Sequence, residues 1–442
     1  MSRIMVEACL MRQDRDRRAI LGLTQVCQAW RSIASGTPRL WTEYNLHFKE
    51  ESLIPVIIQQ AVMWLSLSNQ LLCSVKINFI DCPAETIPDL TPFSQFFASI
   101  GHRLQSLTLG GPYWTHLLKT LPPSLPVLET LRLKLDVKFP ILCYSSKARL
   151  PQSSCLKHVE LQNTHDFFSV SKRLYPSLLP WSQITALSIS ESNWPAATLY
   201  GTLQACSGLV HLQLRWLQWA PDAPVSLLMP SLTKLHIRHP TSGLIPFLDA
   251  LILPSLTELV IDSLINPFSP SHSESLLHLH RRSPFPLRSL NCKNIPLNSE
   301  PFMQFLHRAS TLEQLALHNC MASEGLLENL TTSVAEEPIL PLLQSINIGP
   351  SLVDSSRVNE STVIKFIKSR FWWNDPSRPY PELRHVNFLF SIEADRRGEL
   401  SARRATWKNS GLDIQDFKKD TAPIYTEHLF PFRISHQDVH DL

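Results

Sequence analysis

The sequence predicts an α/β solenoid in which a curved parallel sheet lies on the inside and helices lie on the outside. Three observations predict it. A short apolar pattern, LxxLxL, recurs twelve times, and amphipathic segments of helical length separate its copies. The composition also includes 34 prolines but only 12 glycines, which suits many elements that stop abruptly. Because 44% of the residues are apolar, the chain can bury a sizeable core.

The twelve copies start 23 to 40 residues apart, mostly within or just beyond the roughly 20 to 29 residues of leucine-rich repeats. They begin at Leu72, Leu104, Leu128, Leu156, Ile184, Leu209, Leu232, Leu256, Leu287, Leu312, Leu343 and Leu383. In each copy the last two apolar residues lie two positions apart, so they point to the same side of a short strand. A single strand cannot bury that side alone, so we expect successive units to stack into about twelve irregular repeats.

The segments between the triplets predict the outer layer. In residues 242–253 and 299–310 the apolar residues recur at steps of three and four, as in a helix packed on a sheet. An Asn or Cys normally follows three positions after each triplet, and only Cys320 does so here. We therefore expect a loose variety of the repeat, in which the usual ladder of buried asparagines is largely missing.

Ahead of the repeats, residues 23–41 read LTQVCQAWRSIASGTPRLW. Leu23, Val26, Trp30 and Ile33 recur at steps of three and four, which predicts one amphipathic helix that ends before Pro38. On periodicity alone, this helix is the N-terminal cap that a solenoid needs to shield its first repeat.

The residues of this string closely resemble the second half of an F-box, with its Val-Cys-x-x-Trp-Arg core, Ile-Ala, and Thr-Pro-x-Leu-Trp. The next stretch, AVMWLSLSNQLLCSVKI, is similar to the one found in many F-box proteins with leucine-rich repeats from mushroom-forming fungi. The resemblance implies that the segment docks a Skp-family adaptor of a cullin ubiquitin ligase, while the repeats bind an unidentified target protein. The implied linker contacts are Ile4, Val6, Leu23, Val26, Cys27, Trp30, Ile33, Pro38, Leu40 and Trp41.

The sequence departs from the F-box pattern at its start, where the Leu-Pro-x-Glu opening is absent and Ile4 and Val6 stand for the end of the first helix. Either the chain starts late or part of the docking surface is lost. We expect an F-box-like helical segment at 1–48, a repeat solenoid at 49–390, and a C-terminal cap with a polar tail at 391–442. The alternative is a leucine-rich-repeat scaffold without a ubiquitin-ligase link, whose N-terminal helices only cap the solenoid.

The concave side of the sheet is the expected target surface, formed by the residues that alternate with the triplet positions. Two consecutive strands carry the densest basic run, with Trp216 and Trp219 just beyond the first of them. The predicted target contacts are His211, Gln213, Arg215, Trp216, Lys234, His236 and Arg238. Such a patch suits an acidic or phosphorylated peptide, although exposed strand residues are also commonly polar without binding anything.

Other function classes find little support. A formal charge of +3 gives no field for nucleic acid or membranes, and no apolar run reaches the length of a membrane helix. Nine scattered cysteines without a signal peptide indicate free thiols in the cytoplasm or nucleus. No catalytic, metal or phosphate-loop motif is present, so we expect no enzyme activity and no cofactor. His278 and His280 are expected in a solvated basic loop, where Ser283 is a weak phosphate acceptor.

Overall fold

The fold comes from a computed structural model that describes residues 17–79, 88–134, 150–162, 179–190, 196–215, 219, 226–238, 243–263, 271–294, 300–318, 320, 324–331, 339–349, 358–370, 383–388, 392–393, 403, 407–408 and 412–414. Ile4, Val6 and Trp216 lie outside these residues, as does most of the expected C-terminal cap and tail.

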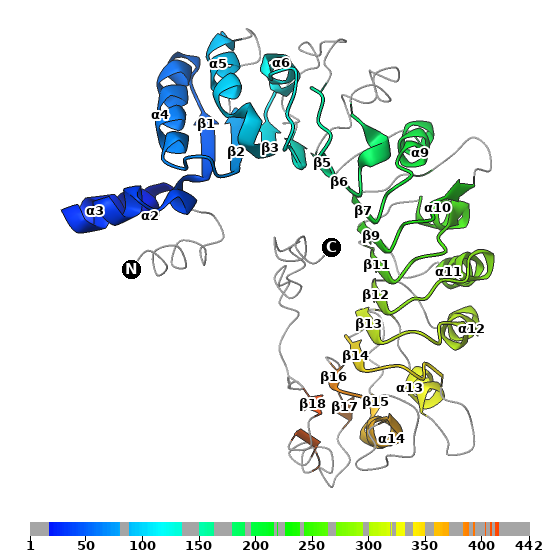
Figure 1. The fold of residues 1–442 in the computed structure, drawn as a ribbon. Coiled ribbons are helices and arrows are strands. Elements are labelled where there is room, and N and C mark those ends of the chain that lie inside the picture. Colours follow the sequence, from blue (N-terminus) through cyan, green and yellow to red (C-terminus); the bar gives the residue numbers. More distant parts are fainter. Residues whose placement is uncertain are drawn as a thin grey trace.

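One parallel sheet of 14 strands runs through the described part of the chain, with its strands in sequence order. The strands are β1 (Glu43–Phe48), β2 (Cys73–Phe79), β3 (Leu104–Gly110), β4 (Thr130–Lys134), β5 (His158–Gln162), β6 (Ala186–Ser190), β7 (His211–Arg215), β9 (Lys234–Arg238), β11 (Glu258–Asp262), β12 (Ser289–Lys293), β13 (Gln314–His318), β14 (Ser345–Ile348), β16 (His385–Phe388) and β18 (Asp413–Ile414). The sheet bends into an arc whose inner side is lined by strands (Figure 1). The α/β prediction of a curved parallel sheet is confirmed.

Helices cover the outer side of the arc (Figure 1). They are α4 (Ile54–Ser66), α5 (Thr91–Ile100), α6 (Trp114–Thr120), α9 (Ala196–Ala205), α10 (Leu244–Ala250), α11 (Ser271–Arg282), α12 (Glu300–Arg308), α13 (Glu324–Leu330) and α14 (Glu360–Arg370), with short turns η2 (Glu51–Leu53), η3 (Gly101–Arg103) and η5 (Trp181–Gln183). Two small parallel pairs join β8 (Leu227–Leu228) to β10 (Leu251–Ile252) and β15 (Val358–Asn359) to β17 (Ile392–Glu393). The two expected outer helices are confirmed as α10 and α12.

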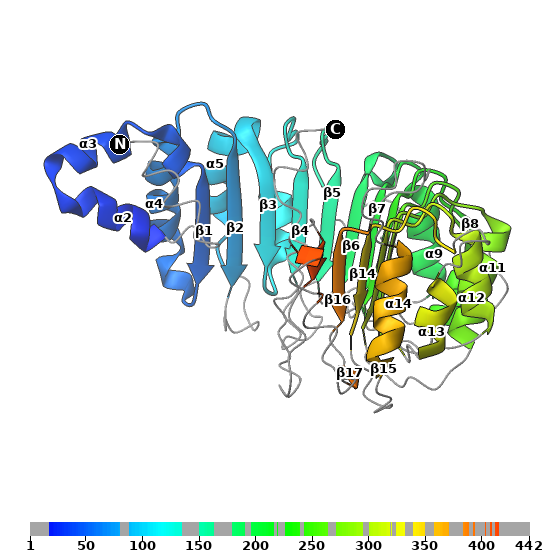
Figure 2. The same ribbon diagram turned by 90° about the horizontal axis from the view of Figure 1, so that it is seen from below.

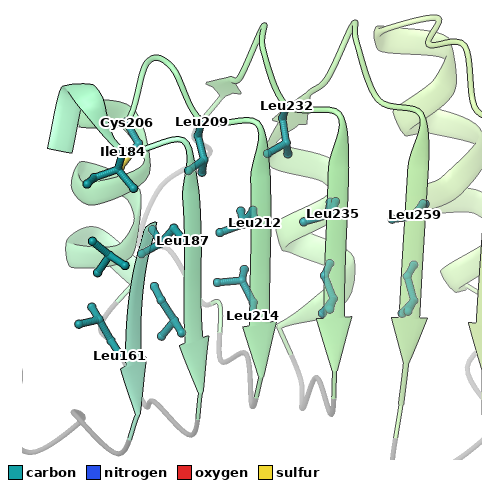
Figure 3. Packing of buried hydrophobic residues seen from close by; sticks show 14 of the residues in the cluster. Leu161, Ile184, Leu187, Cys206, Leu209, Leu212, Leu214, Leu232, Leu235 and Leu259 are labelled. Atoms are coloured by element: carbon teal, nitrogen blue, oxygen red, sulfur yellow. The ribbon is translucent and has the colours of Figure 1, made fainter. Parts of the chain in front are cut away.

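The apolar triplets form the core between the sheet and the helices. All twelve lie on or directly before a strand of the large sheet, from β2 to β16. Figure 3 shows their side chains stacked from repeat to repeat, with Leu212 and Leu214 behind β7 and Leu235 behind β9. Leu72 is the exception, because its side chain is 43% exposed at the N-terminal end of the array. Cys320 follows its repeat as predicted, and its buried thiol donates a hydrogen bond to the carbonyl of Cys292 at 3.2 Å.

Three arginines link successive helices in the same way. Each stands at or just after the C-terminal end of one helix and donates to carbonyls at the C-terminal end of the helix before it, where the helix dipole is negative. Arg103, after α5, reaches the Leu65 carbonyl of α4 at 2.9 Å. Arg282 of α11 reaches Leu248 of α10 at 2.8 Å, and Arg370 of α14 reaches α13.

The predicted segment boundaries need two corrections. Strand β1 belongs to the large sheet, so the sheet begins inside the segment that we expected to be helical up to residue 48. Strand β18 extends the sheet beyond residue 390. Both strands lie at the ends of the array, where only one neighbouring strand is available for pairing.

The expected basic loop around His278 and His280 is also wrong, because both lie in α11. The His280 ring is 8% exposed and packs edge-on against Phe285 and Phe305. Ser283 is buried as well, and its hydroxyl accepts a hydrogen bond from the Leu253 amide at 3.0 Å. A phosphoryl group on Ser283 therefore does not fit this packing.

Candidate functional site

Two short helices precede the sheet, α2 (Arg17–Val26) and α3 (Gln28–Ser35), followed by the turn η1 (Pro38–Trp41). The single helix expected through Leu23 and Ile33 is wrong, because Cys27 adopts an extended conformation with φ −161° and ψ 172°. The Arg31 side chain donates to the Thr24 carbonyl at 2.9 Å and so closes the end of α2. The two helices contact each other and project beyond β1 at one end of the arc (Figure 2).

The predicted linker contacts divide into two groups by exposure. Val26 is 61% exposed and Cys27 is also exposed, whereas Leu40 and Trp41 are each only 3% exposed. The Trp41 indole donates to the Ala34 carbonyl at 2.8 Å and packs edge-on against Trp64 of α4, with ring centroids 4.6 Å apart. Leu40 and Trp41 are therefore wrong as direct contacts; they anchor α3 to the sheet because their apolar surface is buried there.

The remaining predicted contacts are half-buried. Leu23 packs partly against the core, and Trp30, Ile33 and Pro38 each keep part of their surface exposed. Together with Val26, they give α2, α3 and η1 several accessible apolar groups.

Exposed large apolar residues gather at this end of the molecule. Of the ten in the described part of the chain, nine fall between residues 21 and 72, and the tenth is Leu228. We call the nine the N-terminal apolar surface: Leu21, Val26, Leu53, Val56, Val62, Met63, Leu67, Leu71 and Leu72. Exposed apolar patches on folded proteins commonly mark sites of protein association.

Helix α4 and the residues that cap its two ends supply five of the nine, and the sequence reasoning missed them. The core side of α4 carries Ile54, Ile58, Ala61 and Leu65, all buried. Leu53, Val56, Met63 and Leu67 follow helical spacing on the opposite side, and Met63 is 65% exposed. The signal was available, because a helix that is apolar all round needs cover on both sides.

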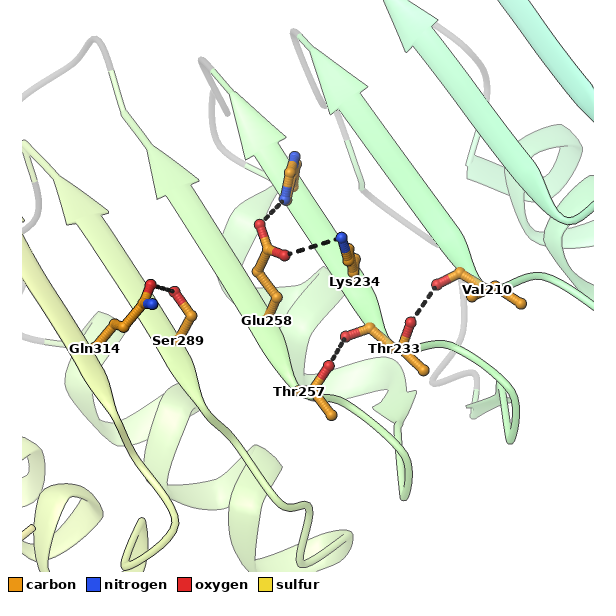
Figure 4. Close-up of polar contacts among 8 residues, drawn as sticks. Val210, Thr233, Lys234, Thr257, Glu258, Ser289 and Gln314 are labelled. Carbon is orange, nitrogen blue, oxygen red and sulfur yellow. Dashed lines mark hydrogen bonds and ion pairs between the residues drawn. The ribbon is translucent and has the colours of Figure 1, made fainter. Parts of the chain in front are cut away.

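On the concave side, the predicted pairing of the two basic strands is confirmed. His211 lies beside Lys234 and Arg215 beside Arg238 in the parallel register of β7 and β9. The neighbouring Glu258 of β11 reaches His236 at 2.8 Å and Lys234 at 3.6 Å (Figure 4). Threonines at the strand entrances add a hydrogen-bonded ladder, from Thr257 to the Thr233 carbonyl and from Thr233 to the Val210 carbonyl (Figure 4).

Only some of the basic residues on β7 and β9 carry a positive charge that no carboxylate shares. Burial, together with the charge of Lys234, lowers the pKa of His211 to about 4, so its ring is neutral at neutral pH. Burial alone would raise the pKa of Glu258. The hydrogen bond from His236 and the charge of Lys234 outweigh that effect, so the pKa is lowered overall and the carboxylate stays ionised. Lys234 and His236 therefore share a negative partner, whereas Arg215 and Arg238 have none among the described residues.

Of the two tryptophans expected beyond β7, Trp216 lies outside the described residues, and Trp219 does not lie on the concave side. Trp219 is 1% exposed and packs edge-on against Phe247 of α10, with ring centroids 5.1 Å apart. Trp219 therefore belongs to the apolar core on the helix side of the sheet. Gln213 lies between His211 and Arg215 on the same strand, partly accessible as predicted.

The described residues bring no group of three His, Cys, Asp or Glu side chains together in a way that could hold a metal ion. Within the same residues, every helix is too short or too polar to cross a membrane. Comparison of the sequence with protein-family models and with curated proteins finds no match.

Proposed function

We propose that this chain is a substrate-recognition adaptor of a Skp–cullin–F-box ubiquitin ligase, acting in the cytoplasm or nucleus. Its helices α2 and α3 dock a Skp-family linker, and its concave strands hold the target protein. The observation that carries the proposal is the N-terminal apolar surface, which adjoins the string that resembles an F-box. The proposal assigns no catalytic step to this chain.

The packing suits such a role because the docking helices are fixed to the sheet. Trp41 connects α3 to α4, and the Trp64 indole donates to the Glu43 carbonyl at the start of β1, at 3.1 Å. A partner held by α2 and α3 therefore keeps a defined orientation to the concave side. Val26, with 61% of its surface exposed, offers an anchor that needs no rearrangement.

The test is binding of a purified Skp-family adaptor to the full chain, measured by calorimetry. Val26→Glu places a charge in the proposed interface and should abolish binding. Leu228→Glu is a matched control, because Leu228 is also 61% exposed but lies mid-chain; it should bind like the unmodified protein. The proposal fails if the unmodified chain does not bind the adaptor, or if both variants bind it equally well.

A scaffold with no ubiquitin-ligase link is the second candidate, favoured by the burial of Ala34, Leu40 and Trp41 against the first repeat. In that case α2 and α3 serve only to cover the end of the solenoid. The two candidates differ at Val26, whose exposed side chain contributes little to a cap. A Val26→Glu variant with unchanged stability and lost adaptor binding supports the ligase adaptor.

A further inference from the structure

Three acidic side chains on the concave face near β7 and β9 are paired with cations. Glu160 accepts from Arg132 at 2.8 Å, and Glu258 is shared by His236 and Lys234. Asp262 pairs with Lys293 at 3.6 Å. These pairs involve neither Arg215 nor Arg238, and no ion pair or hydrogen bond joins either guanidinium to another described residue.

The two arginines are neighbours across the sheet despite their like charge. Arg215 and Arg238 occupy the same register position on adjacent parallel strands, which lie about 4.8 Å apart. Like charges directly opposite one another destabilise a sheet. In addition, the Nε of Arg215 is shielded from solvent and has no acceptor, a cost that an anionic ligand would remove.

The surroundings of this pair form a line of donors across the sheet, which we call the arginine row. It runs through the same register position of the five neighbouring strands β4, β5, β6, β7 and β9, and consists of Lys134, Gln162, Ser190, Arg215 and Arg238. These five residues include no carboxylate. The next strand places Asp262 beside Arg238, and Asp262 is paired with Lys293 at 3.6 Å. On β6, next to Arg215, the three concave side chains are the short Ala186, Ser188 and Ser190, so bulky groups do not cover Arg215 from that strand.

We propose that the arginine row binds a phosphorylated segment of a target protein, with the phosphoryl group between Arg215 and Arg238. A phosphoryl group carries about −1.5 to −2 charges and three acceptor oxygens. Two guanidinium groups can each donate parallel hydrogen bonds to it. A single carboxylate, which has one oxygen fewer, would leave more of these donors unpaired. This inference rests on the proposed function, because it names the class of target that binds the concave surface assigned there.

A protein segment fits better than a nucleic acid. Glu160 lies on β5, a strand of the row, and Glu258 and Asp262 lie on β11, the strand after Arg238. Because these carboxylates hold Arg132, Lys234 and Lys293, those cations are not free for the successive phosphates of a polyanion. The uncompensated charge is local, so it matches one phosphorylated residue in an otherwise neutral segment.

The experiment measures binding of the full chain to a fluorescent peptide pool with one fixed phosphoserine among random neutral residues. The unphosphorylated pool and an oligouridylate RNA serve as comparisons. We expect binding of the phosphorylated pool alone, weakened at least tenfold by Arg215→Gln and by Arg238→Gln. Arg215→Lys keeps the charge but loses the fork, so its loss should be smaller. Lys234→Gln is the matched control, because its charge is already shared with Glu258, and should change affinity less than threefold.

The proposal is overturned if the phosphorylated pool does not bind, if the unphosphorylated pool or the RNA binds as tightly, or if folded arginine variants bind like the unmodified protein. Thermal unfolding of each variant shows whether it is folded. The outcome is separable from adaptor docking: Val26→Glu should keep peptide binding, and Arg215→Gln should keep adaptor binding.

Discussion

Replacement of Arg370 by Met should loosen the C-terminal repeats. The Arg370 side chain is 7% exposed and donates to the carbonyls of Leu330, Ile339 and Leu340, with distances of 2.9 and 3.1 Å to Leu330 and 2.8 Å to Leu340. Three carbonyls without donors cost about 3 to 9 kcal/mol. Burial lowers the pKa of Arg370 to about 10, which indicates that its desolvation costs about 3 kcal/mol. The difference is roughly 0 to 6 kcal/mol, and its middle value, about 3 kcal/mol, is the expected net loss.

Hydrogen exchange of the full chain measures this loss locally. Exchange in α13, β14 and β16 should accelerate about 100-fold, while β2 to β5 stay unchanged because repeats are stabilised mainly by their neighbours. Arg282→Met is the control: Arg282 makes the same kind of link, but its side chain is 33% exposed, so the effect should be below about 1 kcal/mol. Unchanged exchange in β14, or an equal effect in the control, refutes the reasoning.

Three further predictions follow from the buried groups. Burial, aided by nearby lysines, lowers the pKa of both His211 and His318 to about 4. The unfolded chain therefore binds more protons than the folded chain between about pH 6.5 and 4. The free energy of unfolding should decrease as the pH is lowered across that window. The loss should be about 1 to 2 kcal/mol for each ring after solvent screening, and urea unfolding of the His211→Gln, His318→Gln double variant should show a flatter profile. Trp41→Ala should cost about 3 to 5 kcal/mol and expose α3 to trypsin, whereas persistent protection would contradict its role as an anchor. Glu258→Gln should release Lys234 and tighten phosphopeptide binding; weaker binding would argue against an electrostatic site.

Much of the repeat architecture was predictable because the LxxLxL pattern records burial directly. A position that must face the core at every turn of the solenoid leaves a periodic trace, and Leu212 and Leu235 illustrate it. The register of β7 and β9 followed from the same spacing, which is why Arg215 and Arg238 could be placed side by side.

The errors arose where three-dimensional contacts override local pattern. The helical stripe of Leu23 and Ile33 continues through Cys27 in sequence, but the chain breaks there. His280 looked solvated beside two arginines, yet it faces Phe305 in the core. Trp219 is buried by Phe247, a residue of the next repeat that spacing alone does not connect to it.

The strand order fixes the distance between the N-terminal helices and the arginine row. From β1, beside the docking helices, to β7 there are six strand-to-strand steps, or about 29 Å along the arc at about 4.8 Å for each step. In the proposed adaptor, this count sets how far a captured target stands from the ligase. Insertion or loss of one repeat between β1 and β7 would move the target by about 5 Å and turn it about the axis of the arc. The reach of such a protein could thus change in discrete steps while both of its binding surfaces stayed the same.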